Sequence, residues 1–247
     1  MDRLIWTAVS GMNASLARER VIANNMANSQ TPGFRAEVMA STPMTLEGSP
    51  LEVRTLTDAA VYGAQMDQGA VVQTARPLDV ALQGDGLLTV QASDGSEAYT
   101  RRGDLAVSPA GLLTNGDGLA VVGENGPISV PPNSTVTIAA DGAVLVASGT
   151  DPAVPPQQAA RLKLVSWRGS EIAKGLDGQF RVTGGGTLPQ DAEARVVPGA
   201  LEQSNVRPSQ VLIEMVEAQR LFDMRTKLVA TAKELDEGGA SLMRMNA

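Results

Sequence analysis

Both ends of this chain carry long, proline-free stretches with helical periodicity, and few other features restrict its fold as strongly. Between Arg3 and Asn28 the apolar residues recur at steps of four and three: Ile5, Val9, Met12, Leu16, Ala23 and Met26. This spacing places an apolar stripe along one face of a helix. Glu19 occupies a stripe position, so the stripe is imperfect. The turn sequence Thr31-Pro32-Gly33 predicts the end of this helix.

The second stretch runs from Pro208 to about Glu237 and has no internal proline or glycine. Asn205 and Pro208 are start signals, and Gly238-Gly239 predicts a stop. Its stripe follows heptad steps, interrupted by Arg225: Val211, Met215, Ala218, Phe222, Val229 and Ala232. The two helices would be roughly 40 and 45 Å long, more than the rest of the chain can cover. We therefore interpret both stripes as seams for contact with other subunits.

The middle of the chain has a different pattern, in which short apolar runs alternate with turns. Runs such as Leu87–Val90, Val136–Ile138 and Val144–Val146 have the length and composition of strands. Residues that tolerate positive φ separate the runs, in the dipeptides Asp94-Gly95, Asn115-Gly116, Asn125-Gly126, Asp141-Gly142 and Asp177-Gly178. These signals predict an all-β domain.

The predicted fold class is α+β: long N- and C-terminal α-helices pair in a coiled-coil-like region and enclose an extended connector and an all-β middle domain. The predicted segments are 1–34 for the first helix and its turn, 35–73 for the extended connector, 74–203 for the β-rich domain and 204–247 for the second helix.

Composition excludes several classes of function. The 247 residues include no cysteine and no histidine, which excludes Cys/His zinc sites, disulfides and histidine-based triads. The net charge is −7 and no long Lys/Arg cluster occurs, which argues against nucleic acid as a partner. No cleaved signal and no run of about 20 apolar residues is recognisable, so membrane insertion is unsupported. We expect no cofactor and no metal.

Two other classes of function compete with an assembly role. Asp79, Asp85, Asp94 and Asp104 are the best candidates for the carboxylate pair of a cell-wall glycosidase. Asp85 and Asp94 lie beside glycine, however, where aspartate is expected for backbone reasons, so we predict that the chain is not an enzyme. A β-domain adhesin or phage-tail-like module would share the β middle but would not require helical ends.

The chain resembles the flagellar axial family, the rod and hook proteins of the bacterial flagellum. The residues that carry the resemblance are Asn24, Asn25, Ala27 and Asn28; Thr31, Pro32, Gly33, Phe34 and Arg35; and Arg76, Pro77, Leu78 and Asp79. Further matching strings are Tyr99–Gly103, Ser204–Val206 and Glu214–Val216. The opening Met1–Ile5, the Thr-Pro-Gly-Phe turn and Phe222 favour a proximal rod subunit over a distal rod or hook subunit.

The resemblance implies a structural subunit that assembles helically into a hollow, torque-transmitting drive shaft for motility. Its implied partners are itself, other proximal and distal rod proteins, and the flagellar export apparatus, which delivers subunits without a cleaved signal peptide. Its implied location is the basal-body rod crossing the periplasm.

Two alternatives stay open at the first turn. Asn24, Asn25 and Asn28 either cap the helix end alone or also bind neighbouring subunits, and the resemblance favours the dual role. Gly33 either has a positive φ that directs the chain, or lies in an ordinary loop.

Overall fold

The computed structural model describes residues 2–45, 55–132, 134–148 and 155–245. The chain forms two compact units. Unit 1 contains Met1–Ser29, Glu37–Gly63 and Val206–Ala247, and unit 2 contains Gln30–Ala36 and Ala64–Asn205. We describe each unit by itself.

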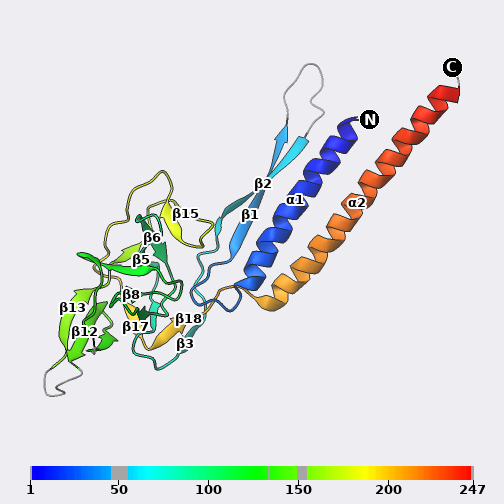
Figure 1. The fold of residues 1–247 in the computed structure, drawn as a ribbon. Helices are drawn as coiled ribbons and strands as arrows, with labels where there is room; N and C mark the ends of the chain where they lie inside the picture. Colours follow the sequence, from blue (N-terminus) through cyan, green and yellow to red (C-terminus); the bar gives the residue numbers. More distant parts are fainter. Residues whose placement is uncertain (1, 46–54, 133, 149–154, 246–247) are drawn as a thin grey trace. The chain divides into compact units, whose positions relative to one another are not determined.

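Unit 1 consists of two helices and a two-stranded sheet. Helix α1 (Asp2–Ala27) contacts both α2 (Pro208–Met245) and β1 (Glu37–Thr45), and β1 pairs with β2 (Thr55–Ala64). The two helices run in opposite directions in Figure 1. Helix α2 continues through Gly238 and Gly239, so the predicted stop there is wrong. Glycine weakens a helix interior by only about 1 kcal/mol and does not by itself end a helix.

The expected extended connector is also wrong, because most of its described residues form strands. Residues 35–73 include all of β1, β2 and β3 (Val71–Gln73). Pro43 lies within β1 and argues against a strand when the sequence is read alone. Both strands of a two-stranded sheet are edge strands, however, and an edge tolerates the missing proline N–H.

The coiled-coil-like pairing is contradicted by the face that α1 buries. Among residues 9–27, the part of this helix whose side chains the structure describes, the buried residues are Ala14, Ser15, Val21, Ile22 and Asn25. They lie on the side opposite the predicted stripe, of which Leu16 and Ala23 are exposed. Helix α1 has two neighbours within unit 1, so its inner face is set by both α2 and β1 and not by one heptad seam. The fold class is therefore a mainly β chain with two terminal helices that contact each other without a coiled-coil seam.

The described residues of unit 2 form sixteen short strands. After β3 they are β4 (Val80–Leu82), β5 (Gly86–Gln91), β6 (Glu97–Thr100), β7 (Ala106–Val107), β8 (Leu113–Thr114), β9 (Ala120–Gly123), β10 (Gly126–Pro127), β11 (Ser134–Ile138), β12 (Ala143–Ser148), β13 (Gln157–Arg161), β14 (Leu164–Ser166), β15 (Ile172–Lys174), β16 (Phe180–Val182), β17 (Val196–Pro198) and β18 (Ala200–Glu202). The largest sheet has the order β15-β16-β6-β5-β9-β8-β7, with β14 also on β5 and β10 on β9, and β11-β12-β13 form a second sheet.

The first and last strands of unit 2 pair with each other. Strand β3 pairs antiparallel with β18 and β4 with β17, so that Leu201 faces Val72 and Val196 faces Leu82. These long-range pairs close the unit, because they join its beginning to its end.

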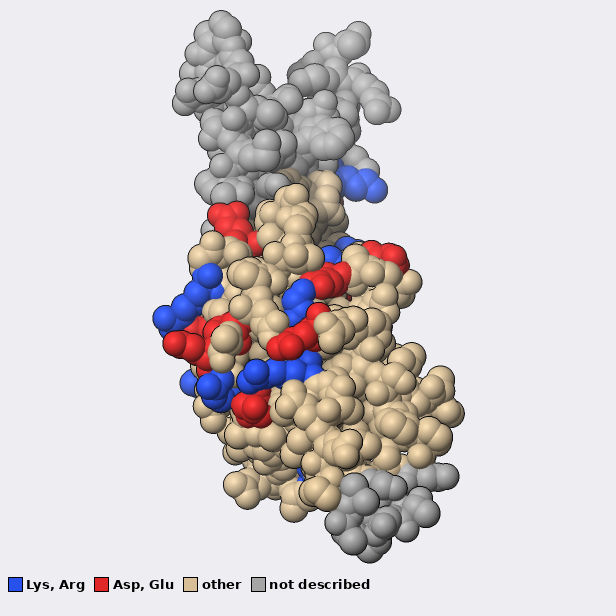
Figure 2. Space-filling view, turned by 90° about the vertical axis from the view of Figure 1, so that its left-hand side faces the viewer, with Lys and Arg blue, Asp and Glu red and all other residues tan. Residues whose placement is uncertain are grey.

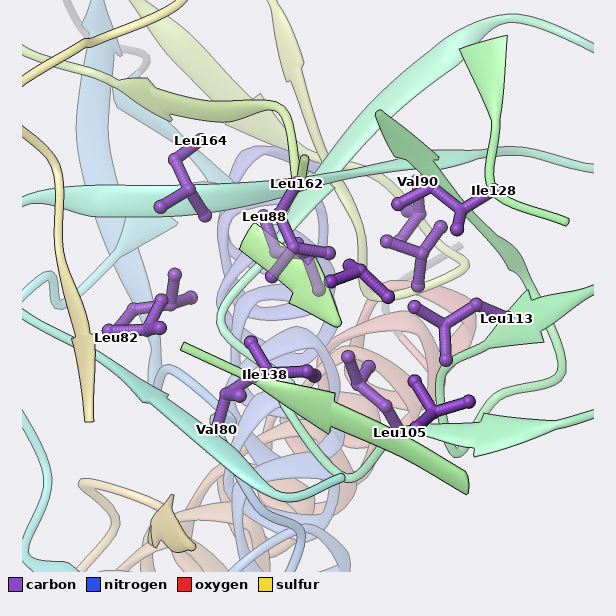
Figure 3. Packing of buried hydrophobic residues seen from close by; sticks show 14 of the residues in the cluster. Val80, Leu82, Leu88, Val90, Leu105, Leu113, Ile128, Ile138, Leu162 and Leu164 are labelled. Carbon is purple, nitrogen blue, oxygen red and sulfur yellow. The ribbon is translucent and has the colours of Figure 1, made fainter. Parts of the chain in front are cut away.

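The β-rich middle has a continuous aliphatic core. Figure 3 shows side chains such as Leu88, Leu113 and Ile138 converging from separate strands, and all three are at most 4% exposed. A smaller cluster surrounds Tyr99 and Phe180. The hairpin between β11 and β12 turns at Asp141-Gly142, where Gly142 has a φ of 82°, as a positive-φ turn dipeptide predicts. Among the helices of the described residues, none has the length and apolar content of a membrane span.

Candidate functional site

Helix α2 has apolar side chains on two faces. The predicted seam follows the inner face, where Val211 and Ala218 are buried and Met215, Phe222 and Val229 are half-buried. The outward face carries a second apolar set with exposed fractions from 48% to 62%: Leu212, Ile213, Val216, Met224 and Leu228. We call this set the outer stripe. Large apolar side chains gathered on one helix face are typical of a contact surface.

Arg225, which interrupts the seam of α2, makes a polar contact with α1. Its guanidinium donates to the Gly11 carbonyl and to the Ser15 hydroxyl of α1. This contact places the inner face of α2 against α1, since Phe222 and Val229 lie on the same side of the helix as Arg225.

The predicted seam of α1 lies away from the interior of unit 1. Leu16 and Ala23 are exposed, Val9, Met12 and Met26 are half-buried, and the side chain of Ile5 lies outside the described residues. The stripe therefore leaves apolar surface uncovered within the chain. Its contact with other subunits stays a prediction.

The asparagine cluster at the end of α1 ties the helix to β1. Asn25 makes a two-way bond with the Glu37 backbone, donating to its carbonyl at 3.0 Å and accepting from its N–H at 2.8 Å. Asn24 donates to the Glu37 carboxylate at 2.6 Å. Asn28 donates to the Asn24 carbonyl at 2.9 Å, which caps the helix end, and Ala27 is the exposed last residue of α1. The capping role is thus present, and bonds to neighbouring subunits stay a prediction.

The Thr-Pro-Gly-Phe turn belongs to unit 2 and packs against its backbone. Gly33 is buried with a φ of 69°, and a Cβ there would lie 2.4 Å from the Arg101 carbonyl carbon and oxygen. Only glycine fits this position, because an L side chain disfavours the conformation and collides with main chain. Thr31 accepts the Phe34 N–H through its carbonyl at 3.2 Å, with the half-buried Pro32 between them. Of the two alternatives at Gly33, the structure shows the positive φ and not the ordinary loop.

Lys174 holds the end of this turn. Its ammonium lies 3.6 Å from the centroid of the Phe34 ring and donates to the Arg35 carbonyl at 3.0 Å. A cation over an aromatic face is stabilised by the negative charge density of the ring.

Glu202 is the buried centre of this region, and its side chain is fully inaccessible. Arg101 donates from Nε and Nη2 to Oε2 at 2.8 and 2.5 Å. Arg35 Nη1 lies 2.5 Å from Oε1, although its N–H is not aligned for a hydrogen bond. The Gly69 N–H donates to Oε1 at 2.8 Å, and the Gly33 N–H donates to the Glu202 carbonyl at 2.7 Å.

Electrostatics in this cluster depend on that one carboxylate. Burial lowers the pKa of Arg101, the charge of Glu202 opposes this effect, and the nearby Arg35 adds to the lowering. Arg101 also donates to the carbonyls of Leu82, Gly84 and Gly86 at 2.8, 2.6 and 2.7 Å. Two buried cations around one anion leave a net positive charge, which these carbonyl dipoles partly compensate.

The second family string, Arg76-Pro77-Leu78-Asp79, leads into β4. Arg76 and Pro77 are exposed, Leu78 packs against the main core and Asp79 is 1% exposed. The Asp79 carbonyl accepts from Gly199 N–H at 2.7 Å, and its carboxylate lies 3.7 Å from Arg76 without a hydrogen-bond partner in the described chain. This string therefore joins the entry of unit 2 to its exit.

The other carboxylates considered for catalysis are committed to local structure. Asp85 pairs with Arg168, Asp104 accepts from Arg102 at 2.8 Å, and Asp94 accepts from the Ser96 hydroxyl at 2.6 Å. The hydrogen bonds from Ser96 hold the pKa of Asp94 below its usual range. These contacts are those of turns and surface ion pairs. Figure 2 shows basic and acidic side chains interleaved on one face of the molecule.

Sequence reasoning did not identify Glu202, Lys174 or Arg225 as important contacts. Arg35 and Arg101 appear in the matching strings without an assigned role, and Asn205 is interpreted as a start signal of the second helix. Their roles depend on partners far away in the chain, and Arg101 and Glu202 are 101 residues apart. A charged residue within an otherwise apolar strand is the one available signal, and Glu202 beside Leu201 has it.

Comparison with known families gives three matches in order along the chain. Residues 5–35 match the family described as "Flagella basal body rod protein", residues 81–146 match "Flagellar hook protein FlgE/F/G D1 domain", and residues 197–242 match "Flagellar basal body rod FlgEFG protein C-terminal". The first match includes the Thr-Pro-Gly-Phe turn of residues 31–34, which we call the anchored turn. The third match includes Asn205 and most of α2.

Individual relatives match over nearly the whole length. The "Flagellar basal-body rod protein FlgF" of Salmonella typhimurium is 42% identical over 100% of both chains, and that of Escherichia coli is 43% identical over 95% of each. The "Flagellar basal-body rod protein FlgG" of Caulobacter vibrioides is 28% identical over 96% of this chain and 97% of its own. The chain belongs to the family of flagellar basal-body rod proteins.

Proposed function

We propose that this chain is a structural subunit of the proximal rod of the bacterial flagellar basal body and not an enzyme. The full-length identity of 42% to a protein named FlgF carries this proposal. A FlgG relative reaches only 28%, which favours the proximal assignment over the distal one. The subunit assembles with other rod components.

Assembly uses apolar helix surface that the chain itself leaves uncovered. The outer stripe of α2 and the exposed Leu16 and Ala23 of α1 supply it. Full burial of a Leu, Ile or Val side chain stabilises by about 1.5–3 kcal/mol, so even partial burial of the outer stripe favours association by several kcal/mol. The half-buried Met215, Phe222 and Val229 extend this surface at its border.

The subunit contacts further copies of itself and the neighbouring proximal and distal rod proteins. It reaches them through the flagellar export apparatus, without a cleaved signal peptide, and the rod crosses the periplasm as a hollow drive shaft. The anchored turn at Gly33 supports this role, because a helical assembly requires the same chain path in every copy.

Three strains test this function. Intact basal bodies are isolated from cells that express the wild-type chain, and mass spectrometry of the rod fraction should detect it. Val216→Asp, on the outer stripe, should remove the chain from basal bodies and abolish motility. The matched control is Val216→Thr, which keeps nearly the same side-chain size at the same position and adds no charge, and it should assemble normally. Absence of the wild-type chain from the rod fraction would refute the proposal.

A further inference from the structure

Three segments of unit 2 lie next to the points where the chain continues into unit 1. One ends at Ala36, one begins at Ala64 and one ends at Asn205. Their backbones are hydrogen-bonded to one another inside unit 2. The Gln65 N–H donates to the Ala36 carbonyl at 2.8 Å, and the Asn205 N–H donates to the Phe34 carbonyl at 3.3 Å. The three segments therefore lie side by side.

The Asn205 side chain joins all three segments. Its Oδ1 accepts from the Ala36 N–H at 2.7 Å, and its Nδ2 donates to the carbonyls of Gln65 and Asp67 at 2.7 and 3.0 Å. A carboxamide provides an acceptor and two N–H donors on one rigid plane, and here all of them are used. Aspartate has the same size but lacks the donors and would place negative charge against two carbonyl oxygens. Alanine lacks every contact.

Glu202 supports the same arrangement from within the unit. Its backbone carbonyl accepts from Gly33 and its carboxylate accepts from Gly69, so residues 202–205 bind both of the other segments at two levels. The inner level is buried, whereas Asn205 is half-buried at the outer level. Asn205 is thus the last side chain that holds the segments together before the chain leaves unit 2.

We propose that Asn205 is a positioning residue that clasps the three segments. Its hydrogen bonds make the segment ends at Ala36, Gln65 and Asn205 move as one body. This clasp keeps the distances between the three segment ends equal in every copy of the subunit. Its value for rod assembly rests on the proposed function, but the clasp itself does not. It acts on local order and not on the core, because none of its bonds involves the aliphatic core cluster.

Amide hydrogen exchange of the full-length chain tests the clasp at single residues. In Asn205→Ala the Ala36 and Gln65 amides should exchange at least about fivefold faster, since each loses a bond or its support. In Asn205→Asp the Ala36 amide should stay protected through the remaining acceptor, while the Gln65 amide exchanges faster. Gln203→Ala, in the same segment, is the control and should change neither amide. Amides of core strand β5 should keep their protection in all variants.

Unchanged exchange at Ala36 in Asn205→Ala would overturn the clasp, as would equal acceleration in Gln203→Ala. A cellular arm separates this failure from failure of the proposed function. Asn205→Ala should be secreted at the wild-type level yet give at least about threefold fewer assembled rods, a modest effect expected of a lost local contact. Normal rod numbers would overturn the role of the clasp in assembly. Absence of the wild-type chain from rods bears on the proposed function alone.

Discussion

Gly33→Ala is the smallest change that tests how the anchored turn is held. The substitution adds one methyl group at a φ of 69°, a conformation that costs an L residue about 1–2 kcal/mol. The new Cβ would also lie 2.4 Å from the Arg101 carbonyl, a main-chain group that cannot rotate away. Relieving such a contact costs about 1–3 kcal/mol, so the expected loss is about 2–5 kcal/mol.

Two further glycines separate these contributions. Gly95 has a φ of 84° and open space at its Cβ position, so Gly95→Ala should cost only the conformational part, about 1–2 kcal/mol. At Gly103 a Cβ would lie 1.8 Å from the Val80 carbonyl oxygen without a positive φ, so Gly103→Ala reports the steric part. Gly33→Ala combines both effects and should exceed Gly95→Ala clearly.

Urea unfolding of the full-length chain measures these losses. The chain has two tryptophans, and Trp167 packs against the smaller cluster of unit 2. A Trp6→Phe background makes Trp167 fluorescence a specific probe of that unit. With a denaturant slope of about 1–3 kcal/mol per molar, the midpoint should fall by about 1 M or more in Gly33→Ala. A loss no larger than that of Gly95→Ala would refute the close packing of the turn on Arg101.

In cells the same position separates assembly from export. Gly33→Val should be secreted but should incorporate poorly into rods, leaving cells without hooks and filaments. We expect this defect because valine at position 33 causes the same backbone and steric strain as alanine, and its β-branched side chain increases that strain. Normal rods would reject the directing role of the turn, and loss of secretion would assign the motif to export.

Four further outcomes are expected. Met215→Asp should abolish rod assembly while unit 2 keeps its melting transition, because a carboxylate at a covered helix surface costs several kcal/mol. Normal motility at a normal protein level would contradict the assignment of Met215 to a subunit seam. Glu202→Gln should destabilise unit 2 by about 3–5 kcal/mol in urea titrations, since both buried arginines lose their counter-charge. A loss below about 1 kcal/mol would show that the two arginines do not depend on the charge of Glu202. Ala75→Gly should raise the free energy of unfolding of unit 2 by up to about 1 kcal/mol, because Ala75 has a φ of 59°, and a lower urea midpoint would count against strain there. A fragment of residues 74–202 should show β-type circular dichroism and a cooperative melt. It should melt at a lower temperature than a fragment of residues 64–205, which keeps β3. Equal melting temperatures would show that the β3–β18 pair is dispensable.

Local chemistry in the sequence determined the type of most elements. The helical ends follow from period and the absence of proline, and the β middle follows from apolar runs divided by Asp-Gly and Asn-Gly turns. Gly33 is identifiable as a turn residue for the same reason, since its backbone freedom is a local property. The family strings at both ends indicate the assembly role without any knowledge of the contacts within the fold.

Tertiary structure decided which surfaces meet. A stripe such as Leu16 and Ala23 shows that one helix face is apolar, but the face that α1 buries depends on the joint packing of α2 and β1. The strands β1 and β2 exist because they pair with each other, and no local signal encodes that partner. The Glu202 cluster and the Asn205 clasp join residues from distant segments, and their energies arise only when folding excludes water and brings these groups into contact.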